Sequence, residues 1–62
     1  MSPEKLGILR QIADGKSYKE IAADVKTTEQ VIKNIVNQMC GRNEARNRVH
    51  LVAKAFRKGV IS

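Results

Sequence analysis

Apolar residues recur along this chain at spacings of three and four, the period of an α-helix, in four separate segments. The first spans about 3–14, the second follows Ser17, the third spans about 29–40, and the fourth lies within 47–59. No stretch alternates apolar and polar residues as a half-buried strand does. The pattern therefore predicts an all-α fold, one compact domain of four helices over residues 1–62.

Capping residues mark where these helices begin and end. A capping box at Ser17 and Glu20 opens the second helix, because each side chain accepts a hydrogen bond from the other residue's backbone. The third helix has two candidate caps, Thr27 and Thr28. Gly41 is predicted to end that helix, since glycine takes the left-handed backbone of a helix C-terminus at no steric cost.

The fourth segment carries two apolar stripes side by side. The wider one is predicted to face the core and comprises Val49, Val52, Ala53 and Phe56. A body of this size does not bury both stripes, so we expect Leu51 and Ala55, rimmed by Lys54 and Lys58, to form a two-fold contact between copies. The alternative is that Leu51 packs beneath the connection at 42–46 and Ala55 only favours the helix.

The second and third segments are joined by the three-residue turn Lys26-Thr27-Thr28. Such a tight connection makes two helices cross steeply, the arrangement that places the second helix in the DNA major groove. Amide side chains pair with adenine and lysine pairs with guanine. The predicted base contacts on the exposed face are Gln30, Val31, Lys33, Asn34 and Asn37. Two alternatives stay open, that these are ordinary solvent-facing residues and that Val31 is core rather than a contact for a thymine methyl group.

Positive charge is concentrated in the second half of the chain. The net charge is +6, and residues 33–62 hold seven of the twelve Lys and Arg residues against one of the six acids. Such a patch favours a polyanionic partner, although it also suits a solvated surface. The predicted phosphate contacts lie at helix starts and are Lys16, Ser17, Tyr18, Lys19, Arg46 and Arg48. Alternatively, Ser17 only caps its helix and the lysines are solvated, and the arginines pair with Glu44 or Asp24.

Other function classes find little support in the composition. One Cys and one His offer neither an intramolecular disulfide nor a metal site, and we expect no cofactor. No Ser-His-Asp, Cys-His or paired-carboxylate arrangement stands at a plausible spacing, so we expect no enzyme activity. No apolar run approaches the roughly 20 residues of a membrane span. The single Cys favours a reducing compartment, so we expect a cytoplasmic protein.

Several short runs, correctly spaced, resemble the LuxR-type (GerE-like) helix-turn-helix domain over nearly the whole chain. They are Ile8-Leu9, Gly15-Lys16-Ser17, Lys19-Glu20-Ile21-Ala22, Arg46-Asn47-Arg48 and Leu51-Val52. The resemblance implies a transcription-regulating domain that binds double-stranded DNA as a homodimer, with its third helix in the major groove and its fourth at the dimer contact. It also implies a nucleoid-associated protein of a bacterium or phage. Such domains usually follow a sensor or receiver domain, so the chain is either a freestanding regulator or an excised domain.

The chain departs from the family pattern in and after the third segment, and the departure within that segment leaves an alternative function open. Ile35-Val36 stands where the family often has His-Arg, Asn43 where a leucine packs in the core, and Glu44 where the family has a turn glycine. The more apolar third helix keeps open a protein-interaction module that docks on RNA polymerase or another regulator. The salt dependence of binding distinguishes the two functions. DNA binding releases counterions and weakens steeply as the salt concentration rises, whereas apolar docking is nearly insensitive to salt.

Overall fold

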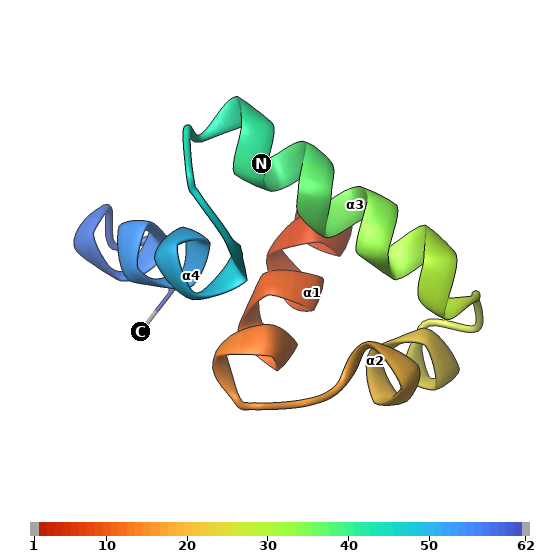
Figure 1. Ribbon diagram of the computed structural model, residues 1–62. Coiled ribbons are helices and arrows are strands. Elements are labelled where there is room, and N and C mark those ends of the chain that lie inside the picture. Colours follow the sequence, from red (N-terminus) through yellow and green to blue (C-terminus); the bar gives the residue numbers. More distant parts are fainter. Residues whose placement is uncertain (1, 62) are drawn as a thin grey trace.

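The computed structural model describes residues 2–61, and this part of the chain contains four α-helices joined by short connections. They are α1 (Pro3–Ala13), α2 (Tyr18–Asp24), α3 (Glu29–Arg42) and α4 (Arg48–Arg57). In Figure 1, α1 lies in the middle, α2 and α4 lie on opposite sides of it, and α3 runs above α1 toward α2. The prediction of an all-α, four-helix domain is confirmed.

Each helix begins at a polar side chain that accepts a backbone N–H of its first turn. Ser17 caps α2, as the capping box predicts, and Ser2 and Asn47 cap α1 and α4. Of the two threonines before α3, Thr28 is the cap, and its hydroxyl accepts the N–H of Val31 at 3.2 Å. These starts are local features, because the cap and its partner are three residues apart.

All four helices end in one motif, in which the chain turns through a left-handed residue. The left-handed residues are Gly15 (φ 86°), Lys26 (φ 59°), Glu44 (φ 54°) and Gly59 (φ 72°). In each case the next N–H returns to a carbonyl in the last turn, as in Ala45 N–H to Cys40 C=O at 2.8 Å. Lys26 and Glu44 adopt this conformation at a cost of about 1–2 kcal/mol each, because their Cβ crowds the backbone.

The prediction that Gly41 ends α3 is wrong. Gly41 lies inside the helix, which continues to Arg42, and Glu44 takes the left-handed position instead. Asn43 compensates in part, since its side-chain Nδ2 donates to the Met39 carbonyl at 2.7 Å. The polar Asn43-Glu44 pair therefore closes α3 with hydrogen bonds, where the family pattern has an apolar residue and a glycine.

The core draws on every helix and on the residue that follows α4. Its members are buried to at least 94% and are Ile8, Leu9, Ile21, Ala22, Ile32, Val36, Met39, Leu51, Ala55 and Ile61. Within it α3 packs against α2 and α4, and α1 packs against the same two helices. Ala22, on the inner face of α2, is small enough to let α3 cross closely.

The predicted orientation of α4 is wrong, and with it two residues of the predicted dimer contact. Leu51 and Ala55 are 2% and 6% exposed, so they belong to the core and are not available to a second copy. Val49 and Phe56, expected inside, are 73% and 49% exposed. The reason lies beyond α4, where the turn at Gly59 brings Ile61 into the core and supplies the bulk that Phe56 was expected to provide.

Candidate nucleic-acid interface

The outer face of α3 is polar along its whole length. Gln30, Lys33, Asn34 and Asn37 are exposed on the side opposite the buried residues of the helix. The Gln30 Nε2 donates to Asn34 Oδ1 at 2.9 Å, across one helical turn. The bond holds the two amides in a fixed mutual orientation, and each keeps a further donor or acceptor for a partner.

Val31 lies at the edge of this face and outside the core. It is 40% exposed and lines a shallow hollow with Val25 and Ile35, bordered by Glu4. Val31 is therefore not a core residue at the turn, which was the alternative. Ile35 is half-buried, so the departure at this position replaces a basic side chain with an apolar flank beside the polar face.

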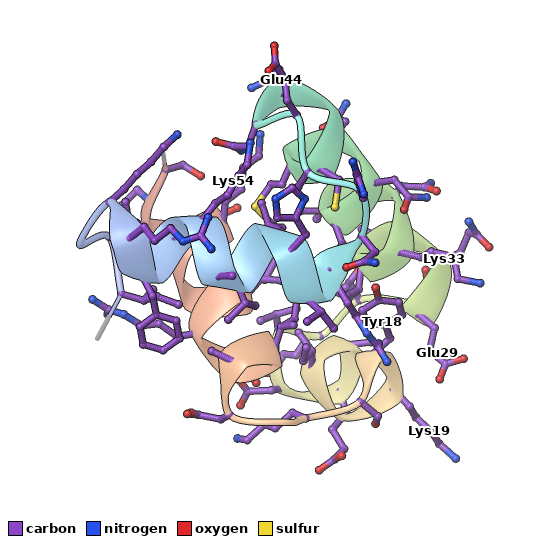
Figure 2. The ribbon with its side chains drawn as sticks, turned by 60° about the vertical axis from the view of Figure 1, so that its left-hand side comes forward. Tyr18, Lys19, Glu29, Lys33, Glu44 and Lys54 are labelled. Carbon is purple, nitrogen blue, oxygen red and sulfur yellow. The ribbon has the colours of Figure 1, made fainter. Side chains whose placement is uncertain are left out.

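The start of α2 lies beside the start of α3. Figure 2 shows Tyr18, Lys19, Glu29 and Lys33 on one side of the molecule. Tyr18 lines a common hollow with Glu29, Gln30 and Lys33. Two groups of predicted residues, those for phosphates and those for bases, thus meet on one surface, although they come from different helices.

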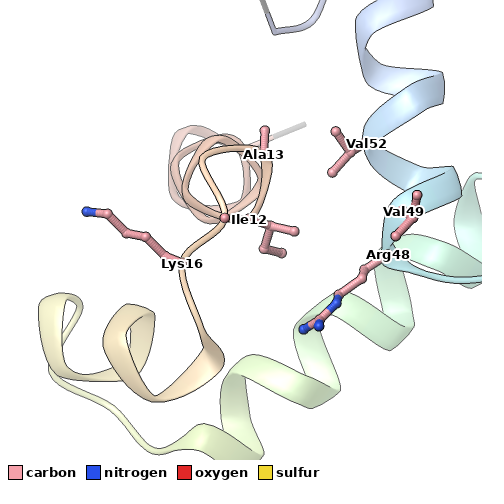
Figure 3. A pocket seen from close by; sticks show the side chains of 7 residues that line it. Ile12, Ala13, Lys16, Arg48, Val49 and Val52 are labelled. Atoms are coloured by element: carbon pink, nitrogen blue, oxygen red, sulfur yellow. The ribbon is translucent and has the colours of Figure 1, made fainter.

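Arg48 joins this surface from the first turn of α4. Its guanidinium lies over the Tyr18 ring, 5.0 Å from the centroid, which is the geometry of a cation–π contact. Figure 3 shows Arg48 and Lys16 on opposite sides of the hollow between α1 and α4. The Asp24 carboxylate, an alternative partner for the arginines, instead accepts a hydrogen bond from Gln11 at 3.2 Å.

Arg46 is exposed in the connection before α4, and its backbone N–H donates to the His50 Nδ1 at 3.0 Å. The bond ties down the backbone of Arg46 and leaves its side chain at the surface. Arg46 therefore contributes positive charge close to the start of α4, as predicted, from a position fixed by that helix.

Ser17 and Glu20 form the predicted capping box. The Ser17 N–H donates to Glu20 Oε1 at 3.1 Å, and the Glu20 N–H donates to the Ser17 hydroxyl at 3.2 Å. The backbone bond and then the hydroxyl of Ser17 hold the pKa of Glu20 below its ordinary value. Ser17 is thus occupied as a cap, and its contact with a phosphate stays a prediction. The N–H groups of Tyr18 and Lys19 are the first-turn donors that the box leaves over.

Glu29 belongs to this surface, although it is not among the contacts predicted from the sequence. It is exposed in the first turn of α3 and lines the hollow that Tyr18 and Lys33 share. A carboxylate at this place repels phosphates but accepts a hydrogen bond from the amino group of cytosine. The signal in the sequence is its position, because the N-terminal residues of a recognition helix contact base edges.

An apolar face runs along the outside of α4. It comprises Val49, Val52, Ala53 and Phe56, and the α1 residues Ile12 and Ala13 continue it across a hollow. Figure 3 shows Val49 and Val52 on one wall of that hollow and Ile12 on the other. Of the predicted rim residues, Lys58 is exposed, whereas the Lys54 amino group is bonded to the connection before α4.

Two further findings concern residues 2–61 only. No three His, Cys, Asp or Glu side chains in this part of the chain gather closely enough to hold a metal ion. None of the four helices has the length and apolar character needed to cross a membrane.

Comparisons with known proteins place the chain in a family. Residues 1–55 match the family model of bacterial regulatory proteins, luxR family (GerE). The chain is also similar to the transcriptional regulatory protein DesR of Bacillus subtilis (strain 168), with 29% identity over 52 residues. That match covers 84% of this chain but 26% of the relative's length. No solved structure gives a significant match. The family match spans most of the chain, and the helix-turn-helix lies within it, so the chain belongs to the luxR family of bacterial regulatory proteins and carries its DNA-binding domain.

Proposed function

We propose that this chain regulates transcription by binding a specific sequence of double-stranded DNA, with α3 in the major groove. The observation that carries the proposal is the shared surface in Figure 2, where the polar face of α3 lies beside the basic start of α2. The major groove is about 12 Å wide and admits one α-helix. If α3 enters the groove with Lys33 facing the bases, Lys19 lies near the flanking phosphates.

The base contacts divide by chemistry. Lys33 suits the acceptors of guanine, and Asn37 and the bonded pair Gln30 and Asn34 suit the adjacent donor and acceptor of adenine. Val31, exposed at the edge of the face, suits a thymine methyl group. A site rich in A·T pairs with one guanine is the expected target.

The phosphate contacts frame α3. Lys16 and Lys19 are exposed around the start of α2, and Arg46 and Arg48 are exposed around the start of α4. The Tyr18 ring holds the Arg48 guanidinium in place, which lowers the entropy lost when that guanidinium binds a phosphate. Ser17 and Tyr18 would contribute from the start of α2 through backbone or hydroxyl groups.

Selection of bound sequences from random duplex DNA tests the proposal. We expect one recovered motif, and Lys33→Ala should lose about 1–3 kcal/mol of binding and relax the preference at one base position. Lys19→Ala should weaken binding to all sequences equally and reduce the salt slope by about one. If no motif is recovered, or if Lys33→Ala keeps the full preference, α3 does not read the sequence.

Dimerisation on DNA belongs to the proposal and uses the outer face of α4. Val49 and Phe56 are the exposed large apolar residues of this helix, and Val52 lies half-buried between them. A contact through one helix is isologous and small, below the roughly 1,200 Å² of a stable interface, so paired half-sites would drive it.

Val49→Glu should test this dimer contact. The variant should keep the helical circular dichroism and the affinity for one half-site but lose cooperative binding to a duplex with two half-sites. Leu51→Glu should instead unfold the domain, because Leu51 is buried. Unchanged cooperativity in Val49→Glu places the dimer contact elsewhere.

The same apolar face supports the second candidate function, docking on RNA polymerase or another regulator. Nearly three quarters of Val49 is exposed, and the neighbouring hollow is lined mainly by apolar side chains. Apolar docking depends little on salt, whereas contacts with phosphates depend on it steeply. Binding that resists salt, together with no recovered DNA motif, would favour docking over DNA recognition.

A further inference from the structure

The amino group of Lys54 connects α4 to the end of α3. Its Nζ donates to the backbone carbonyl of Asn43 at 2.6 Å and to that of Glu44 at 3.3 Å. Figure 2 shows Lys54 and Glu44 at the end of the molecule away from Tyr18 and Lys19. Hydrogen bonds from an ammonium group are shorter and stronger than those between neutral groups, so this contact is a firm link between the two helices.

Lys54 donates to two carbonyls that lie past the end of α3. They belong to the residues just beyond α3, where the helix no longer supplies hydrogen-bond donors. Glu44 holds a left-handed backbone there, and the Asn43 side chain turns back to the Met39 carbonyl at 2.7 Å. The side chain of Asn43 thus bonds to the last turn of α3, and the Lys54 amino group bonds to the backbone carbonyl of Asn43.

The neighbours of Lys54 on α4 serve the same connection. Asn47 Oδ1 accepts the His50 N–H at 2.9 Å, and the His50 ring accepts the Arg46 N–H at 3.0 Å. Residues 47, 50 and 54 are spaced by three and four and share one side of the helix. His50 and Lys54, on this side of α4, therefore both bond to the connection at 43–46.

We propose that Lys54 is a positioning residue for DNA recognition and sets the angle at which α3 is presented to the major groove. The inference rests on the proposed function. α3 packs against α2 and α4, so its tilt depends on how each end is held. The turn at Lys26 holds the N-terminal end, and the Lys54 bonds hold the C-terminal end. Recognition needs side chains within about 0.5 Å of their productive positions, a tolerance that a tilting helix exceeds.

Lys54→Met tests the role, because methionine keeps an unbranched stem and a high helix propensity but has no donor. Arg57→Met is the matched control, since it removes one positive charge from an exposed position on the same helix. On the selected duplex, Lys54→Met should bind about tenfold more weakly, the factor that one charge-assisted hydrogen bond supplies. Its salt slope should equal that of the parent chain, and Arg57→Met should bind like the parent.

Lys54→Arg should restore most of the affinity, because a guanidinium also donates to two carbonyls. In NMR spectra, Lys54→Met should shift the amide resonances of residues 43–46 and of α3, and Arg57→Met should not. This second readout needs no DNA, so it separates the two proposals. A parent chain that binds no duplex refutes the proposed function, and shifted amides without weaker binding refute the positioning role.

Three other outcomes overturn the inference. A salt slope reduced by about one makes Lys54 a phosphate contact. Equal losses in both methionine variants assign the effect to net charge. Should Lys54→Met melt too low for binding assays, the comparison is made in a Glu44→Gly background, where glycine adopts the left-handed turn without strain. Equal affinity with and without Lys54 in that background also refutes the role.

Discussion

Leu51 and Val49 lie two positions apart on α4 and have opposite surroundings. Leu51 is 2% exposed, whereas Val49 is 73% exposed. Truncating each to alanine therefore tests how α4 is rotated about its own axis. Leu51→Ala should destabilise the domain strongly, and Val49→Ala should leave its stability almost unchanged.

The magnitudes follow from burial. Truncation of a buried leucine costs about 2–5 kcal/mol, because the side chain leaves a cavity in addition to the lost transfer free energy. A domain of 62 residues has a total stability of about 3–9 kcal/mol. Leu51→Ala thus removes a large share of it and lowers the melting temperature by on the order of 15 °C. At Val49 the change should stay within about 0.5 kcal/mol, since little apolar area is lost and alanine favours the helix.

Urea unfolding followed by circular dichroism at 222 nm measures both changes. The midpoint should fall for Leu51→Ala at an unchanged slope, while Val49→Ala should overlay the parent curve. A larger loss at Val49 than at Leu51 would mean that α4 turns its other stripe inward, and the dimer contact proposed for the outer face of α4 would then be wrong as well.

Three further predictions concern other parts of the chain. Gly7→Ala and Gly41→Ala should each stabilise the domain by about 0.5–1 kcal/mol in the same urea assay, because both glycines lie within helices and a Cβ at either meets open space. The pKa of Glu20 is lowered in the folded state, so its contribution is present above its ordinary pKa of 4.5 and is lost as the pH falls; Glu20→Gln should therefore lose less stability than the parent between neutral pH and pH about 3. Burial raises the pKa of the Cys40 thiol, so at pH about 8 it should react with a disulfide reagent more slowly than a free cysteine does.

The helix starts and the helix-turn-helix were predictable from the sequence. The caps of α2 and α4 form through hydrogen bonds between residues three positions apart, namely Ser17 with Glu20 and Asn47 with His50. The sequence pattern that predicts such a cap therefore lies in the same short stretch as the cap itself. The exposed face of α3 also follows from its period, because the buried residues Ile32 and Val36 leave the opposite side polar.

The interface was predictable only in part. Tyr18 and Arg48 stand in different helices, and no local pattern indicates that one stacks on the other. Tyr18 of α2 lines the same hollow as Glu29 and Lys33 of α3 because the turn before α3 brings α2 and α3 together. Contacts of this kind depend on how the helices cross, and the crossing cannot be predicted from the spacing of residues along each helix.

What the sequence by itself determined is the set of four helices, their caps, the turn between α2 and α3, and the family. What only the tertiary structure decided is which stripe of α4 is buried and what closes α3. Both stripes of α4 have helical spacing, but only Leu51 and Ala55 are buried, in a core that also contains Ile61. At the end of α3, Gly41 has the suitable residue type but lies within the helix, and the carbonyls of Asn43 and Glu44 are satisfied by Lys54 on α4. The physical reason is common to both cases. Periodicity and capping act over three or four residues. Packing between distant segments decides which face of a helix is buried and which side chain donates to the carbonyls beyond a helix end.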